Sequence, residues 1–89
     1  MARKPKLSVA LITPQATVYE GEADMVVLPA WDGEVGILRG HAPMMALLGE
    51  GTMRVTLEEE GEQRFFVAGG FMQVADNVVS ILSDKAERR

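Results

Sequence analysis

The most regular pattern in the sequence is an alternation of apolar and polar residues in its second half. Across residues 52–58, Met53, Val55 and Leu57 alternate with threonine, arginine and glutamate. This period of two predicts a strand with one dry face and one wet face. A Glu-Glu-Gly turn follows, and residues 62–68 return as the hairpin partner. We therefore expect a β-hairpin whose apolar face lies in the core.

Shorter runs of the same kind fill the rest of the chain. They are separated by turn-forming residues such as Pro14, Asp32-Gly33 and Asp76-Asn77, and the Gly69-Gly70 pair is expected to break a strand sharply. Only residues 44–48 fit a helix as well as a strand. The pattern predicts an all-β protein of about nine or ten short strands. An open sheet of this size would expose an apolar face, so we expect a small flattened β-sandwich or barrel.

Composition narrows the class of protein. The chain has 89 residues, of which 47% are hydrophobic, and it has no cysteine. Disulfides, cysteine-based metal centres and thiol catalysis are therefore excluded. No apolar run approaches the roughly 20 residues needed to cross a bilayer, and no signal-peptide segment follows the basic start. We expect one domain over residues 1–89, on the cytoplasmic side and not inserted in the membrane.

Charge is unevenly distributed along the chain. Residues 1–6 and 85–89 form short basic tails, which we interpret as solvated chain ends in preference to sites for lipid or an acidic partner. Between Leu7 and Asp84 there are three basic residues and twelve acidic ones. An acidic body disfavours nucleic acid as a partner, because contacts to phosphate dominate that affinity.

Residues that commonly carry catalysis form no recognisable set. His41 is the only histidine, and none of the three serines lies on a glycine-flanked turn suited to a nucleophile. A metal site would need His41 together with Asp32 and Glu34, whose spacing matches no ligand motif. A phosphate-binding loop is absent from the sequence. We expect a protein that is not an enzyme and that has no cofactor and no catalytic or metal residues.

The segment between Leu28 and Pro43 is richer in glycine, charge and aromatic character than a small sandwich needs. By itself it fits an elaborate edge turn and a binding loop on a rigid scaffold equally well. Residues 27–44, VLPAWDGEVGILRGHAPM, resemble the ATP synthase epsilon subunit pattern, roughly LPG-x-x-GE-x-GI-x-x-GHAPL. GTMRV at 51–55, VAGGF at 67–71 and VSILSDKA at 79–86 match its later motifs in order.

The match departs from the family pattern in four places. Ala30 replaces a usual glycine, Trp31 adds a bulky ring to the loop, and Arg39 replaces a common proline. Met44 in place of leucine is a conservative change. The family often carries two C-terminal helices after the sandwich, and this sequence stops at Arg89. Either the natural protein is a short form without that helical hairpin, or the sequence is the sandwich domain of a longer chain; we expect the short form.

The resemblance implies a non-catalytic rotor subunit in the central stalk of an F-type ATP synthase. Such a subunit binds the gamma subunit and the polar loops of the c-ring, and it couples ion translocation to ATP synthesis. The resemblance assigns two sets of interface residues, of which Thr13 is placed without a motif match, and it implies a location peripheral to the cytoplasmic face of a bacterial plasma membrane. The c-ring set is Glu34, Trp31 and Arg39, and the gamma set is His41, Met45, Ala46 and Thr13.

Two other classes of function stay open at this point. A stand-alone small-molecule-binding β-module would have a closed apolar pocket and no protein partner. A metal-assisted hydrolase centred on His41 would lose its activity on chelation and in a His41→Ala variant.

Overall fold

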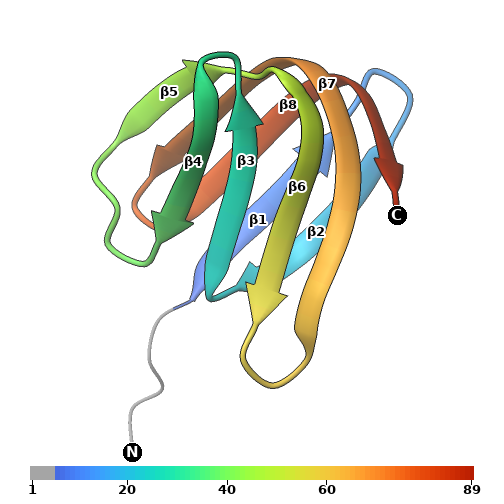
Figure 1. Cartoon of the computed structure of the whole chain (residues 1–89). Coiled ribbons are helices and arrows are strands. Elements are labelled where there is room, and N and C mark those ends of the chain that lie inside the picture. The colour runs from blue at the N-terminus through green and yellow to red at the C-terminus, as the bar shows by residue number, and fades with distance from the viewer. Residues whose placement is uncertain (1–5) are drawn as a thin grey trace, which may run out of the picture.

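The computed structural model describes residues 6–89, and within that range all regular structure is β-strand (Figure 1). Eight strands are present where the sequence predicted about nine or ten. The difference arises mainly at Gly69-Gly70, because the seventh strand continues through this pair. The strands are β1 (Leu7–Ile12), β2 (Thr17–Ala23), β3 (Met25–Ala30), β4 (Gly33–Leu38), β5 (Met44–Leu47), β6 (Glu50–Leu57), β7 (Gly61–Ala75) and β8 (Val78–Arg88).

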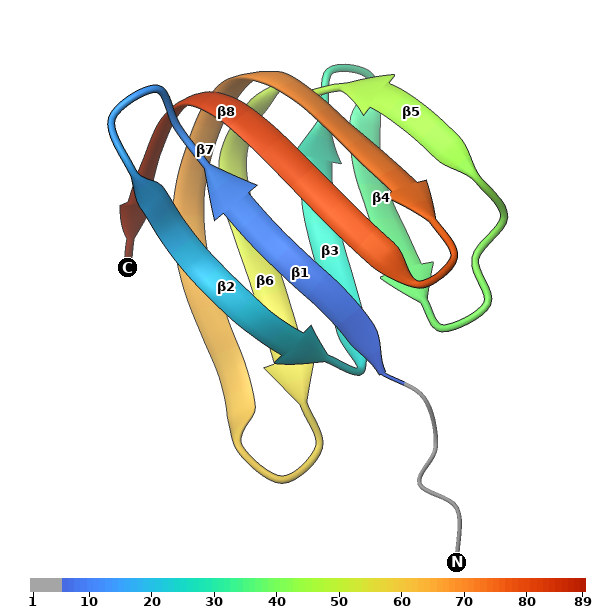
Figure 2. The ribbon, with the colours of Figure 1, turned by 180° about the vertical axis from the view of Figure 1, so that it is seen from behind.

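The strands belong to one sheet that folds over into two layers. Its order is β2-β1-β8-β7-β6-β3-β4, and β5 pairs separately with β7. One layer, here called the β1 layer, contains β1, β2, β5 and the facing parts of β7 and β8 (Figure 1, Figure 2). The other, the β3 layer, contains β3, β4, β6 and the remaining part of β7. This architecture confirms the all-β sandwich predicted from the sequence.

β7 passes from one layer to the other at its glycine pair. Residues before the pair bond to β6, and residues after it bond to β5. Gly69 and Gly70 have φ angles of 69° and 95°, which disfavour any other residue. A Cβ atom on Gly70 would also overlap the carbonyl oxygen of Leu82 in β8. Glycine is therefore needed here so that two bonded strands can bend together.

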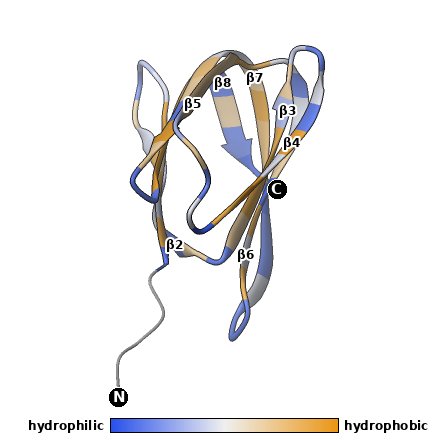
Figure 3. Cartoon of the chain, turned by 90° about the vertical axis from the view of Figure 1, so that its left-hand side faces the viewer, coloured by the Kyte–Doolittle hydropathy of each residue, from blue (hydrophilic) through white to orange (hydrophobic). Residues whose placement is uncertain are grey.

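Alternate residues of both layers fill the space between them. Phe65 is the largest fully buried side chain, and the ring of Tyr19 packs 5.2 Å from it. Figure 3 shows the layers from the side, with hydrophilic residues at the tip of the β6–β7 hairpin. Met53 and Val55 lie in the core as predicted, whereas Leu57 is half-buried. The other core residues include Leu7, Val9, Leu11, Val26, Leu28, Ile37, Val67, Met72, Val74, Val79 and Ile81.

Two further expectations are corrected or resolved by the fold. Residues 44–47, which fitted either a helix or a strand, form β5. Residues 85–88 were assigned to a basic tail, but they form the end of β8 and pair with residues 65–68 of β7. Of the N-terminal tail, residues 1–5 lie outside the described residues, and the Lys6 ammonium lies 2.8 Å from the Asp24 carboxylate.

Candidate interaction surface

The outer surface of the β1 layer carries large apolar side chains at the end where β7 bends. Four of these side chains are direct cross-strand partners and form a row that we call the apolar row. The row consists of Leu47 of β5, Phe71 of β7, Leu82 of β8 and Ile12 of β1. Leu47 is 63% exposed, Leu82 41% and Phe71 37%. Large apolar side chains that lie together in solvent are typical of surfaces that bind a protein, a membrane or a ligand. The apolar row is therefore the leading candidate for an interface.

This layer also differs in charge from the rest of the protein. Residues 7–23, 44–47 and 71–84, which supply its strands and short turns, contain no lysine or arginine. Glu20 and Glu22 lie on β2 at its margin. The arginines of the described strands lie in β6, β7 and the end of β8. The outer surface of the β1 layer therefore combines the apolar row with an acidic margin on β2.

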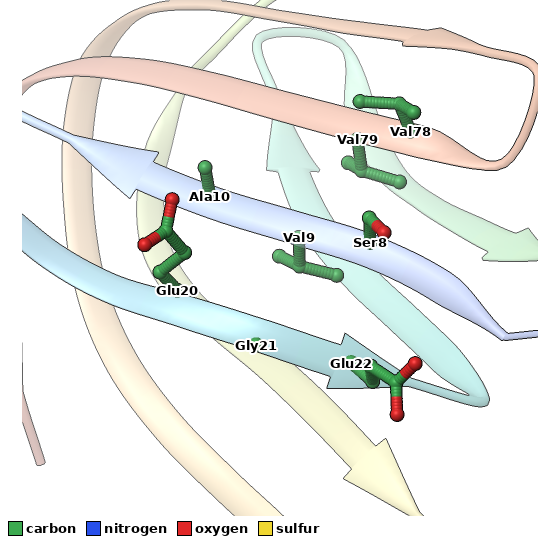
Figure 4. A pocket seen from close by; sticks show the side chains of 8 residues that line it. All are labelled: Ser8, Val9, Ala10, Glu20, Gly21, Glu22, Val78 and Val79. Carbon is green, nitrogen blue, oxygen red and sulfur yellow. The ribbon is translucent and has the colours of Figure 1, made fainter.

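Two hollows interrupt this surface. One is a groove of about 370 Å³ over β1, between β2 and β8 (Figure 4). The other, of about 240 Å³, lies beside Phe71 and Leu82 and includes Thr13 at its edge. Both lie on the outside of the sandwich, because the space between the layers is filled by core side chains.

Trp31 and Glu34 lie at one end of β4, at the turn that joins it to β3. Trp31 is 71% exposed, and its backbone N–H donates to the carbonyl oxygen of Leu47 at 3.0 Å. A Glu34 carboxylate oxygen lies 3.7 Å from a guanidinium nitrogen of Arg54. The structure therefore brings these two predicted residues together and attaches their turn to one end of the apolar row.

Arg39 lies at the opposite end of β4 and not with the other predicted ring residues. At about 3.3 Å per residue, the strand between Glu34 and Arg39 spans about 16 Å. The Arg39 guanidinium instead contacts an Asp24 carboxylate oxygen at 3.3 Å. Sequence proximity suggested one group, but an extended strand places its ends far apart.

Asp24 is the centre of a polar network at this end of the molecule. One carboxylate oxygen accepts from the Lys6 ammonium at 2.8 Å, and the other accepts from the Glu58 backbone N–H at 2.8 Å. The bond from Lys6, followed by that from Glu58, lowers the pKa of the Asp24 carboxyl, and the same contact raises the pKa of Lys6. These bonds connect the start of β1 with the β2–β3 junction and the β6–β7 hairpin.

The four residues predicted at the gamma interface do not all face the same way. Met45 points outward on β5 and is 66% exposed, whereas Ala46 packs against the core. The Thr13 hydroxyl accepts from the backbone N–H groups of Gln15 and Ala16, in the turn after β1. Met45 and Thr13 therefore border the outer surface of the β1 layer, and Ala46 does not.

His41 lies in the loop between β4 and β5. Its Nδ1 atom is 2.7 Å from the Ala42 carbonyl oxygen. The neighbouring Gly40 N–H donates to the Asn77 side-chain oxygen at 2.8 Å, so this loop lies against the β7–β8 turn. Among the described residues, no group of three histidine, aspartate or glutamate side chains could hold a metal ion. In the same range, no helix is long and apolar enough to cross a bilayer.

Sequence reasoning missed the apolar row. A signal was present, because Phe71 and Leu82 adjoin the buried Met72 and Ile81, so these strands are apolar on both faces. A strand that is apolar on both faces is covered on both sides or offers one side to a partner. Which residues form a row depends on the register of four strands, and the sequence does not show that register.

Comparisons with known proteins agree with this architecture. The family model "ATP synthase, Delta/Epsilon chain, beta-sandwich domain" matches residues 6–89. ATP synthase epsilon chain 2 of Ralstonia nicotianae is 45% identical over 84 residues, which are 94% of this chain and 60% of that protein. The ATP synthase epsilon chain of Rhodopirellula baltica is 47% identical over 76 residues, which are 85% of this chain and 59% of that protein.

A solved structure has the same fold. A chain of the Euglena gracilis mitochondrial ATP synthase, from its OSCP/F1/c-ring structure in rotational state 1, aligns with a TM-score of 0.86 and 23% identity. The alignment covers 98% of this chain and 56% of that chain. The chain spans about 60% of the length of the Ralstonia and Rhodopirellula epsilon chains. From its match over residues 6–89, the chain belongs to the ATP synthase delta/epsilon chain family, through the β-sandwich domain of that family.

Proposed function

We propose that this chain is a non-catalytic rotor subunit in the central stalk of an F-type ATP synthase. It binds the gamma subunit and the polar loops of the c-ring, and it is peripheral to the cytoplasmic face of a bacterial plasma membrane. Membership of the epsilon chain family and similarity to named epsilon chains support this assignment. It couples ion translocation to ATP synthesis by holding the gamma subunit to the ring.

The apolar row carries the proposed gamma contact. Three of its side chains, Leu47, Phe71 and Leu82, are exposed and Ile12 is half-buried, and burying apolar surface gains about 25 cal/mol per Å². Met45 and Thr13 border the same surface, in line with their assignment from the sequence. His41 belongs to the loop at the other end of β5 and extends the contact. Ala46 supports the gamma contact indirectly, because its side chain packs on the core on the inner side of β5.

The turn between β3 and β4 carries the proposed c-ring contact. Glu34 offers a carboxylate to basic groups of the ring loops, and Trp31 offers a large exposed ring of the kind that anchors interfaces. Arg54 lies 3.7 Å from the Glu34 carboxylate and holds it on this side of β4. Arg39 is left out of this contact, because it lies at the far end of the strand.

Torque transmission needs a stiff connection between the two contacts. Residues 29–31 and 47–49 supply it, because the Trp31 N–H bonds to Leu47 and the Gly49 N–H donates to the Pro29 carbonyl oxygen at 2.8 Å. A bridge between Ala30 and Leu48 lies between these bonds. The proposed ring contact and gamma contact therefore share one bonded corner of the sandwich.

The test compares two leucines of similar exposure. Leu47 is 63% exposed in the apolar row, and Leu38 is 58% exposed on β4. Affinity for the purified gamma subunit of the same ATP synthase is measured for the wild type, Leu47→Asp and Leu38→Asp. We expect at least about a tenfold loss for Leu47→Asp and little change for Leu38→Asp. A wild-type chain that does not bind gamma, or equal binding by both variants, would contradict the proposal.

A further inference from the structure

The groove over β1 is built from three neighbouring strands (Figure 4). Its floor consists of the small residues Ser8 and Ala10 of β1. Glu20 and Glu22 of β2 rise on one side, and Val78 of β8 rises on the other. Small residues between longer ones let another chain approach the sheet closely.

The strand pairing decides what kind of segment can occupy the groove. β1 is bonded to β2 on one side and to β8 on the other, so its backbone is already paired. An extended segment therefore cannot add to β1 through backbone bonds, and recognition depends on side chains. Strands lie about 4.8 Å apart, so the backbones of β2 and β8, on either side of β1, are about 10 Å apart. An α-helix has a diameter of about 10 to 12 Å with its side chains, so one helix covers three strands at this spacing.

The two sides of the groove differ in chemistry. The β2 side carries the carboxylate of Glu20, and the β8 side carries Val78, which is 49% exposed. Residues 7–23 and 71–84, which supply the strands around the groove, contain no lysine or arginine that would repel a cation. A helix that fits must therefore be basic along the edge that meets β2 and apolar along the edge that meets β8.

We infer that the groove over β1 receives an amphipathic α-helix of the gamma subunit. Its small or apolar residues pack on Ser8 and Ala10, and a lysine or arginine pairs with Glu20. This inference rests on the proposed function and deepens it, because it names the secondary structure and charge of the partner segment. The groove adjoins the apolar row, since Ala10 and Ile12 are outward-facing neighbours on β1.

Photo-crosslinking in the assembled ATP synthase identifies the occupant directly. A photoreactive amino acid replaces the exposed Ser8, and the crosslinked peptide is sequenced. We expect a gamma-subunit peptide in a helical segment, with a lysine or arginine within one helical turn of the crosslinked residue. A peptide from a loop or strand, a peptide without basic residues, or the absence of a crosslink would overturn the inference.

A charge-reversal pair separates this inference from the proposed function. Glu20→Lys changes the groove, and Glu60→Lys, on the β6–β7 hairpin, is the matched exposed control. We expect affinity for gamma to fall about tenfold for Glu20→Lys, less at high salt, and to stay unchanged for the control. If Glu20→Lys binds normally while Leu47→Asp does not, gamma uses this surface but the groove inference is wrong. If neither variant matters, the proposed gamma contact itself fails.

Discussion

The backbone N–H of Trp31 donates a hydrogen bond to the carbonyl oxygen of Leu47 across 3.0 Å. This bond joins the β3–β4 turn to β5, and both side chains are mostly exposed. The side chains are therefore available to partners while their backbones belong to one bonded corner. A substitution of either side chain leaves the backbone bond in place, so binding can be changed without a large effect on folding.

The first prediction concerns Trp31 itself. Because its ring is 71% exposed, Trp31→Ala should change the free energy of unfolding by less than about 0.5 kcal/mol. Binding of the chain–gamma complex to purified c-ring should weaken about tenfold or more, since an exposed tryptophan is a common interface anchor. Trp31→Phe, which keeps an aromatic ring, should retain much of the affinity. Unchanged ring binding by Trp31→Ala would remove this residue from the proposed contact.

The second prediction concerns the bend in β7. Gly70→Ala places a Cβ against the Leu82 carbonyl oxygen at a φ of 95°, and it should cost about 2 to 4 kcal/mol of unfolding free energy. Gly40→Ala is the control, because its φ of 78° is also positive and no atom lies within 4 Å of the new Cβ. We expect about 1 kcal/mol there. Urea unfolding of both variants measures the difference, and equal costs would show that the Gly70–Leu82 contact does not determine stability.

The third prediction concerns pH. The pKa of Asp24 is lowered in the folded state by Lys6 and by the Glu58 N–H. The unfolded chain therefore holds the proton more readily, and stability falls as acid titrates the folded-state carboxyl. The contribution of Asp24 should be complete above about pH 4 and should disappear as the pH falls through its lowered value.

Urea midpoints at neutral pH and at about pH 2 to 3 test this sign. Asp24→Asn should be less stable than wild type at neutral pH, and the gap should narrow in acid. Asp32→Asn, in the exposed β3–β4 turn, is the control and should follow the wild type at both pH values. A gap for Asp24→Asn that stays the same in acid would show that its charge does not stabilise the fold.

Local patterns were sufficient to predict part of the fold. Met53 and Val55 were assigned to the core because a period of two fixes which side of a strand is buried. The sequence predicts two strands where the structure has the single strand β7. Gly69-Gly70 looks like a break unless the pairing of β8 with both halves of β7 is known. Local sequence signals glycine flexibility, and only long-range pairing decides whether the strand ends or bends.

The candidate site shows the same division. The loop motif brought Trp31 and Glu34 together correctly as neighbours, because both lie at one turn. The motif also grouped Arg39 with them. Arg39 follows the far end of β4, so the length of this strand separates it from Trp31 and Glu34. The orientation of Ala46 and the composition of the apolar row depend on the register of β5 against β7. No short motif encodes that register.

Reconstitution tests the central claim, that this chain couples rotation, most directly. The ATP synthase is assembled in vesicles with and without the chain, and ion-driven ATP synthesis and ATP hydrolysis are both measured. We predict that synthesis is lost without the chain, is restored by wild type, and is restored poorly by Leu47→Asp. Synthesis that survives without the chain, accompanied by a large release of inhibited hydrolysis, would contradict a coupling role.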